Sequence, residues 1–367
     1  MSRPARALIF TAALRHNLSR VRQLASGARV MAVIKANAYG HGITGAISAL
    51  GDADVFGVAS LEEALAVRAL LPSAQPLCLL EGFFNSDELA TVAGEGLQVV
   101  IHHVSQLEQL EAFRGSGSIA AWVKVDTGMH RLGFPPEALP EILSRVRACE
   151  RVQLLGLMSH LADADVPDSK PTRRQIDLFH DLLATTGLAG SLANSAGIVA
   201  WPESHHDWVR PGIMLYGASP VANKSAEELD LQPAMQAESA LIAINEHRRG
   251  DAVGYGGTFV CPEDMRVGVV AFGYGDGYPR HAPGGTPVIV RDQRVPLIGR
   301  VSMDMITVDL RSLPEASVGD RVMLWGGKLP VDEIAQQAGT IAYELLCRVS
   351  ERVPRVEVAG EPGDGTT

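Results

Sequence analysis

Lys35 lies in the stretch VIKANAYGHG, residues 33–42, directly after an apolar run that reads as a buried strand. Lysine is rarely fully buried unless it is paired, so its place where a core strand meets a glycine-containing turn needs a reason. One interpretation is a solvated lysine at a strand end. The other is an amine held in a dry pocket, where it is neutral and nucleophilic and can condense with an aldehyde. The rest of the chain has to decide between them.

Other polar side chains follow later apolar runs in the same way. They are Lys124, Arg131, His160, Ser195 and Arg210, with Gly212 and Ile213 after the last. If these strand ends converge, the Ser195 hydroxyl and the backbone N–H groups near Gly212 and Ile213 would hold a phosphate. Lys35 on the opposite wall would bind an aldehyde. A site of this kind meets the requirements of pyridoxal 5'-phosphate.

The elements that would position these residues alternate along the first two-thirds of the chain. Apolar, β-branched runs occur at 29–36, 55–60, 76–82, 97–103, 119–126, 152–160, 190–195 and 206–212, with helix-period segments between them. Eight alternating strand and helix units predict an α/β fold, a (β/α)8 TIM-like barrel, with polar side chains at the C-terminal ends of its strands. A doubly wound open sheet is the alternative. No G-x-G-x-x-G follows the first strand, which disfavours it.

The texture of the chain changes near residue 234, where short alternating runs and turn signals begin. We therefore predict two domains. Residues 1–233 would form the cofactor-binding barrel, with a first strand at about 5–11 that could pair with the C-terminal domain. Residues 234–367 would form a mostly β domain, with a disordered tail at 359–367.

Composition excludes several classes of protein. The 367 residues are 46% hydrophobic and 20% charged, with a net charge of −10, which argues against nucleic-acid and anionic-membrane partners. The four cysteines are far apart, so neither a metal site nor a disulfide framework is predicted, and reduced thiols in the cytoplasm are the better interpretation. No apolar run approaches the roughly 20 residues of a membrane span.

Nine stretches in order identify a resemblance over nearly the whole chain. They read VIKANAYGHG, KVDTGMHRLG, LMSHLADAD, NSAG, VRPGIMLYG, VGYGGTF, GYGDGYPR, GRVSMDM and YELLCRVSERVPR. This set strongly resembles alanine racemase, a pyridoxal-phosphate enzyme with a barrel and a β domain, and in texture the proteobacterial biosynthetic and catabolic types. The resemblance implies a homodimer that interconverts L- and D-alanine.

The resemblance also implies a role for each candidate residue. Lys35 would carry the cofactor and act as one catalytic base, and Tyr255, reaching the barrel mouth of the other subunit, would be the second. The remaining implied contacts are Tyr39, Ser195, Gly212 and Ile213 at the phosphate, His160 against the pyridine ring, Arg210 at the ring nitrogen, Arg131 at the phenolic oxygen and the substrate carboxylate, Met303 and Tyr274 closing the substrate pocket from the partner chain, and a carbamylated Lys124.

The chemistry agrees with these roles. Racemisation removes a proton from one face of Cα and returns one to the other, so two bases on opposite faces avoid any swing of a single base. Arg210 can only donate a hydrogen bond, so it would keep the ring nitrogen unprotonated and suppress transamination. Lys124 beside Arg131 would be repulsive unless a carbamate made it anionic. The alternative is an unmodified Lys124 paired with Asp126.

Some departures and alternatives stay open. Some relatives have a phosphate-contacting tyrosine near the C-terminus where this chain has Glu351, so that contact is not expected here. A broad-specificity amino-acid racemase and a decarboxylase of the same fold are alternatives, although a decarboxylase would place a carboxylate where Arg210 stands. A non-catalytic cofactor-carrier barrel would lack the second domain. The sequence does not say whether D-alanine is made for peptidoglycan or degraded.

Overall fold

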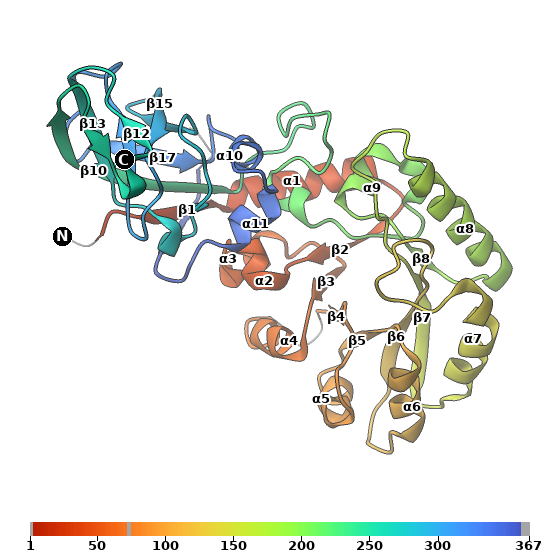
Figure 1. The fold of residues 1–367 in the computed structure, drawn as a ribbon. Coiled ribbons are helices and arrows are strands. Elements are labelled where there is room, and N and C mark those ends of the chain that lie inside the picture. The colour runs from red at the N-terminus through yellow and green to blue at the C-terminus, as the bar shows by residue number, and fades with distance from the viewer. Residues whose placement is uncertain (1–2, 72–74, 361–367) are drawn as a thin grey trace.

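A closed barrel of parallel strands forms one end of the molecule (Figure 1). The computed structural model describes residues 3–71 and 75–360. The barrel strands are β2 (Arg29–Val33), β3 (Val55–Val58), β4 (Leu77–Leu79), β5 (Gln98–Ile101), β6 (Ile119–Lys124), β7 (Val152–Met158), β8 (Gly190–Ser191) and β9 (Trp208–Val209). β9 closes on β2 through the pairs Arg29↔Trp208 and Val30↔Val209. The predicted barrel is therefore confirmed, and the open sheet is excluded.

Large side chains fill the barrel interior, as expected for strands that are buried on both faces. The interior cluster consists of Met31, Val55, Cys78, Val100, Trp122, Met158 and Trp208. The rings of Trp122 and Trp208 meet edge to face with centroids 5.8 Å apart. The barrel is thus a packed core, and its chemistry has to take place at the mouth.

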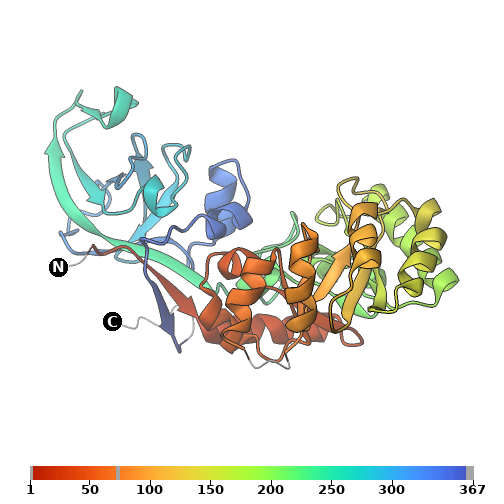
Figure 2. The same ribbon diagram turned by 90° about the horizontal axis from the view of Figure 1, so that it is seen from below.

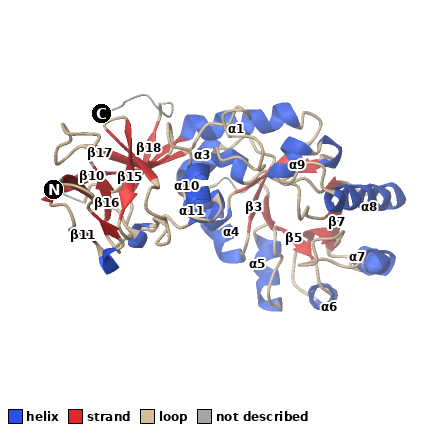
Figure 3. Cartoon of the chain, turned by 45° about the horizontal axis from the view of Figure 1, so that its top comes forward, coloured by secondary structure: helices blue, strands red, loops and turns tan. Residues whose placement is uncertain are grey.

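Helices surround the strands, as Figure 3 shows. They are α1 (Thr11–Leu24), α2 (Lys35–Tyr39), α3 (Ile43–Ala49), α4 (Leu61–Arg68), α5 (Leu89–Gly94), α6 (Val104–Ala112), α7 (Leu139–Ala148), α8 (Lys170–Thr186) and α9 (Ser195–Ala200). In α7 the buried residues Leu139, Ile142, Leu143 and Val146 follow the spacing of one helix face. None of the helices among the described residues is long and apolar enough to cross a membrane.

A mostly antiparallel sheet forms the other end of the molecule (Figure 2). Its order is β13-β16-β15-β14-β17-β10-β1-β18. The strands are β1 (Arg6–Phe10), β10 (Met235–His247), β13 (Met265–Val270), β14 (Pro287–Val290), β15 (Gln293–Ile298), β16 (Ile306–Asp309), β17 (Arg321–Trp325) and β18 (Arg355–Val358). A small hairpin of β11 (Ala252–Val253) and β12 (Phe259–Val260) and two helices, α10 (Val331–Gln337) and α11 (Ala342–Cys347), complete this part. The β-rich C-terminal region is as predicted.

The N-terminal strand belongs to this C-terminal sheet. β1 pairs antiparallel with β10 and parallel with β18, and only then does the chain enter α1 and the barrel. Because β1 belongs to the C-terminal sheet although it precedes the barrel in sequence, the division into residues 1–233 and 234–367 stays a prediction. Most of the tail for which disorder is predicted, residues 361–367, lies outside the described residues.

Candidate active site

Lys35 does not end its strand but begins a left-handed turn. β2 ends at Val33, and the residues after Lys35 have positive φ: 54° at Ala36, Asn37 and Ala38 and 52° at Tyr39. Left-handed helical backbone costs L-residues roughly 1–2 kcal/mol each. Gly40 then ends the turn at φ 80°, where an added Cβ would lie 2.0 Å from the Leu346 carbonyl oxygen on α11. The sequence predicted a glycine-rich turn here, whereas the strained part contains no glycine.

The predicted strand-end residues converge at one mouth. Lys124 is the last residue of β6, His160 follows β7, Ser195 begins α9 after β8, and Arg210 follows β9. The charges of Arg210, Arg131 and Lys35 all act on Lys124. Parallel strands bring their C-terminal ends to one rim, which is why residues far apart in sequence meet here.

Lys124 is buried among cations. It is 9% exposed, and burial lowers its pKa to about 8, with Arg210, Arg131 and Lys35 acting in the same direction. The structure has no ion pair between Lys124 and Asp126 within the described residues. Oδ1 of Asp126 instead accepts the N–H groups of Gly128, Met129 and His130, and Oδ2 lies 3.2 Å from His130 Nδ1. A neutral amine is therefore accessible to Lys124 just above neutral pH.

Arg210 is held by neutral groups. Its Nη1 donates to Ser191 Oγ at 2.6 Å, and its Nη2 donates to the Ser159 and Leu192 carbonyl oxygens. Burial lowers the Arg210 pKa to about 10, so the guanidinium remains charged at neutral pH. Its Nε–H has no acceptor within the described part of the chain. This donor is free to meet an acceptor such as a ring nitrogen.

His160 lies beside Arg210 as a neutral ring. Burial, followed by the charges of Arg210 and Lys124, lowers the His160 pKa well below its ordinary value. Nη2 of Arg210 lies 3.4 Å from His160 Nδ1, and a neutral ring can accept from it there. Arg131 is exposed and shares a small crevice with Lys124 and His160.

A second group of residues forms a cradle for an anion. Gly212 N–H donates to Ser195 Oγ at 2.8 Å, and Met214 N–H approaches the same oxygen at 3.4 Å. An added Cβ at Gly212 would lie 2.5 Å from the Tyr39 hydroxyl, so only glycine lets that hydroxyl approach the backbone. The Ile213 N–H has no hydrogen-bond acceptor within the described residues, so it is available to a ligand. The donors around Ser195 suit a phosphate group, and the free Nε–H of Arg210 suits the nitrogen of an aromatic ring. The residues present therefore fit an aromatic cofactor that carries a phosphate.

Sequence reasoning missed Tyr343. This residue of α11 packs its ring against Tyr39 with centroids 5.9 Å apart, and Tyr39 in turn stacks on Tyr216 at 4.7 Å. Glu351, the position compared with a phosphate-contacting tyrosine, is exposed. A tyrosine in a short helix beside the core residues Leu345 and Leu346 carries no local signal of this contact, which depends on how α11 packs on α2.

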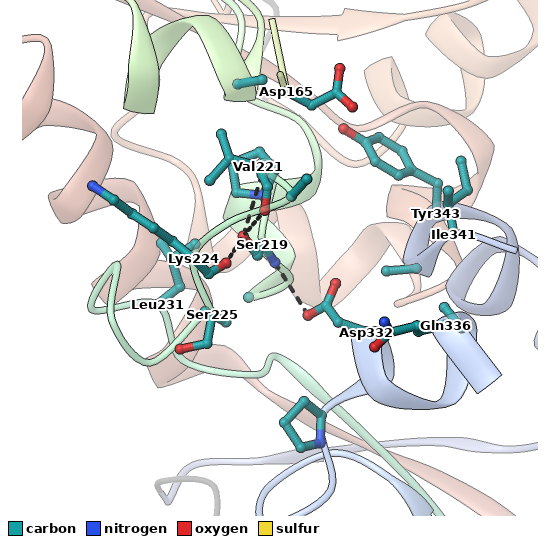
Figure 4. Close-up of a pocket in the computed structure, with 18 of the residues that line it drawn as sticks. Asp165, Ser219, Val221, Lys224, Ser225, Leu231, Asp332, Gln336, Ile341 and Tyr343 are labelled. Carbon is teal, nitrogen blue, oxygen red and sulfur yellow. Dashed lines mark hydrogen bonds between the residues drawn. The ribbon is translucent and has the colours of Figure 1, made fainter. Parts of the chain in front are cut away.

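A large cavity lies beside this site (Figure 4). It has a volume of about 1360 Å³ and lies between residues 161–165, the segment 217–233 and the helices α10 and α11. Tyr343 and Asp165 line it, and Ser219 N–H donates to Asp332 Oδ2 at 3.3 Å. Lys35 does not line it. Charge rather than volume therefore locates the candidate site, because the buried cations gather at the barrel mouth.

The remaining predicted residues lie in the C-terminal region and are exposed. Tyr255 is 68% exposed, Met303 52% and Tyr274 40%. Tyr274 and Met303 are on adjoining loops, since Tyr274 N–H donates to the Ser302 carbonyl and Gly275 N–H to the Met303 carbonyl. Tyr255 lies on the turn between β11 and β12, at the end of the molecule that the C-terminal sheet forms (Figure 3). The structure does not bring Tyr255 to Lys35 of the same chain.

Comparisons with known proteins give the same family over nearly the whole chain. The model of the alanine racemase N-terminal domain matches residues 9–220, and that of the alanine racemase C-terminal domain matches residues 234–357. An alanine racemase of Nitrosococcus oceani is 52% identical over 350 residues, which are 95% of this chain and 98% of that protein. The crystal structure of biosynthetic alanine racemase from Pseudomonas aeruginosa has a TM-score of 0.94 at 47% identity, covering 97% of this chain and 99% of that one. Alanine racemase from Bartonella henselae, solved with covalently bound pyridoxal phosphate, has a TM-score of 0.89 at 29% identity, with 97% and 99% covered.

Proposed function

The chain belongs to the alanine racemase family, and we propose that it interconverts L- and D-alanine with pyridoxal 5'-phosphate held at Lys35. One observation carries this proposal. The buried cations Lys124 and Arg210 share one mouth with Lys35 and the exposed Arg131. None of these four side chains forms an ion pair with a carboxylate among the described residues, and only the charge of Glu81 acts on Lys124 in the opposite sense to the cations. Uncompensated buried cations are costly, and an anionic cofactor would relieve that cost.

Different residues would bind different parts of the cofactor. When bound, pyridoxal phosphate supplies an aldehyde for amines and a ring that stabilises negative charge at Cα. Ser195, Tyr39 and the N–H groups of Gly212 and Ile213 would hold its phosphate, and His160 would pack on its ring. Arg210, whose Nε–H is free, would donate to the ring nitrogen. Because an arginine cannot supply a proton there, charge would spread less into the ring, which favours racemisation over transamination.

Two bases would move the proton. The Lys35 amine would serve one face of the substrate Cα, and the phenol oxygen of Tyr255 from the other subunit would serve the opposite face. In each direction, one base would take the proton from its own face of Cα, and the other base would deliver a proton to the opposite face, so that the configuration inverts. Arg131 would bind the substrate carboxylate and orient the molecule between the bases.

The exposed C-terminal residues support a homodimer. Tyr255, Tyr274 and Met303 are large and exposed, and they belong to the C-terminal region and not to the barrel. In a symmetric dimer, the same surface of each chain would cover the mouth of the other. Tyr274 and Met303 would then leave little room beyond the substrate Cβ, which suits alanine. A broader amino-acid racemase remains the second candidate, distinguished by its rates with larger amino acids.

Lys124 would carry a carbamate. Its neutral amine would attack carbon dioxide, form an N–C bond and release one proton, giving an anionic –NH–COO⁻ group. The pKa of about 8 makes that neutral amine accessible. The carbamate would then pair with Arg131 and orient its guanidinium. We place the enzyme in the cytoplasm, consistent with its four free cysteines.

The test follows optical activity and isotope together. We expect L-alanine incubated with the holoenzyme in D₂O to lose its circular dichroism to zero while deuterium enters Cα. Borohydride reduction followed by peptide mapping should place the cofactor on Lys35. If reduction labels Lys35 while alanine stays unchanged, the protein is a cofactor carrier or acts on another substrate.

A further inference from the structure

The left-handed turn after Lys35 is stabilised by residues of other elements. Residues 36–39 have φ between 52° and 54° without a glycine among them. Backbone of this kind persists only where surrounding contacts determine it, and it concentrates at functional sites. Because the turn joins Lys35 to Tyr39, whatever holds it also sets where the amine and the phenol point.

Glu63 of α4 makes the contact that starts the turn. Its Oε1 accepts the Ala36 N–H at 2.7 Å, and its Oε2 accepts the Ala59 N–H at 2.8 Å. The Ile34 N–H donates to the Gly57 carbonyl at 2.9 Å on the other side of Lys35. The backbone of Lys35 is therefore fixed on both sides by the next barrel unit, β3 and α4.

The hydrogen bond to Ala36 has a specific effect. It fixes the plane of the peptide bond between Lys35 and Ala36, and so the ψ angle from which the turn departs. The first N–H groups of a helical turn have no acceptor inside it. A carboxylate supplies a strong acceptor there, with its charge at the positive end of the turn.

Separate contacts hold the far end. Asn37 Oδ1 accepts the Ile43 N–H at 2.9 Å. The ring of Tyr39 stacks on Tyr216, whose hydroxyl donates to the Val33 carbonyl at 2.9 Å. Through Tyr216, the Tyr39 ring is thus connected to β2, the strand that precedes Lys35. With the far end anchored independently, the start of the turn depends on Glu63.

We propose that Glu63 is a positioning residue, which holds the strained turn so that the Lys35 amine and the Tyr39 hydroxyl face one bound aldehyde phosphate. The assignment rests on the proposed function for the identity of that ligand. The clamp itself rests only on the two hydrogen bonds and the left-handed backbone.

The test replaces the carboxylate by an amide. Glu63→Gln keeps the size of the side chain but leaves an NH₂ group facing one of the two N–H donors. The matched control is Glu62→Gln, one residue earlier on α4, whose exposed carboxylate bonds to Ser60 and not to the turn. Both variants are reconstituted as holoenzyme, and the affinity of the apoenzyme for pyridoxal phosphate, the kcat and KM for L-alanine, and hydrogen exchange of residues 34–42 are measured.

We expect Glu63→Gln to weaken cofactor affinity and lower kcat by about 10-fold each, since it loses one charged hydrogen bond. KM should change by less than about 3-fold, because both carboxylate oxygens of Glu63 are engaged by backbone N–H groups and not directed at a substrate. Exchange at residues 34–42 should become faster. Glu62→Gln should match the parent protein in every measurement, and equal behaviour of the two variants overturns the proposal.

A rescue separates this role from a general loss of stability. Glycine adopts positive φ without strain, so Ala36→Gly in the Glu63→Gln background should recover most of the lost affinity and kcat. No recovery means that Glu63 does not act through the turn, and overturns the proposal. Glu63→Asp, which keeps the charge but shortens the reach, should lie between parent and Glu63→Gln, and supplies the test if the latter does not fold. If borohydride does not label Lys35 in the parent protein, the proposed function fails, whereas the exchange measurement still reports on the clamp.

Discussion

The barrel mouth buries charged side chains, whereas the surface of the C-terminal region exposes large apolar and aromatic ones, and both are unusual for a protein surface. At the mouth, the charged side chains of Lys124 and Arg210 are only 9% and 5% exposed. At the C-terminal surface, Tyr255 and Met303 are 68% and 52% exposed. Burying charge and exposing large apolar groups both cost free energy. In the proposed dimer, the cofactor relieves the first cost and the second subunit relieves the other.

Lys35→Ala is the largest expected disruption on the mouth side of this comparison. Removing the amine removes both a base and the attachment of the cofactor, so racemisation should fall by about 10⁴-fold. Kinetics and borohydride labelling check this. Lys328→Ala, at a surface ion pair with Asp292, should leave both unchanged. Retention of labelled cofactor at another lysine would contradict the assignment.

Tyr255→Phe tests the role of the C-terminal region by removing one oxygen atom, the phenol hydroxyl. Loss of one base should lower kcat by about 10²- to 10³-fold while cofactor affinity stays the same. Tyr278→Phe is the matched control, because the Tyr278 hydroxyl is buried without a hydrogen-bond partner in the structure. Its removal should be neutral or stabilising. Equal kcat values for the two variants would remove Tyr255 from the mechanism.

Arg210→Gln, at the barrel mouth, should shift the reaction from racemisation towards transamination. A glutamine oxygen can accept a hydrogen bond from a protonated ring nitrogen and so stabilise that proton, whereas the arginine can only donate a hydrogen bond. Transamination, detected as pyruvate per racemisation event, should rise by about 10-fold. An unchanged ratio would show that the hydrogen-bonding character at this position does not control the fate of the carbanion.

The smallest expected effect concerns Lys124 and pH. Because its pKa is lowered to about 8, the neutral fraction of the amine should rise from about a tenth at pH 7 to about nine-tenths at pH 9. At constant dissolved ¹³CO₂, the lysine carbamate signal in ¹³C NMR should therefore increase over that range. Lys124→Ala should abolish the signal. A carbamate signal that persists in this variant would place the modification elsewhere.

The barrel was predictable because its strands are continuous apolar runs and parallel topology fixes where they end. That topology alone brings Lys124, His160 and Arg210 to one rim, whatever lies between them in sequence. The exposed C-terminal residues were expected from the resemblance, and no pattern in the sequence places them at the outer surface.

Two features could not be predicted, since long-range contacts decide them. Residues 36–39 have no glycine to mark a left-handed turn, and the contacts that hold it come from Glu63 and Tyr216, far along the chain. Tyr343 meets Tyr39 only because α11 packs on α2. In both cases tertiary contacts override what the local sequence favours.

Hybrid dimers test the central claim, that each active site is shared between two chains. Lys35→Ala and Tyr255→Phe are each inactive alone in this account, and a hybrid of the two contains one site with both bases intact. Subunits unfolded and refolded together in equal amounts should therefore recover about a quarter of the parent activity, since half of the dimers are hybrids with one working site. If the mixture stays inactive while the two chains demonstrably form hybrids, both bases belong to one chain and the shared site is wrong.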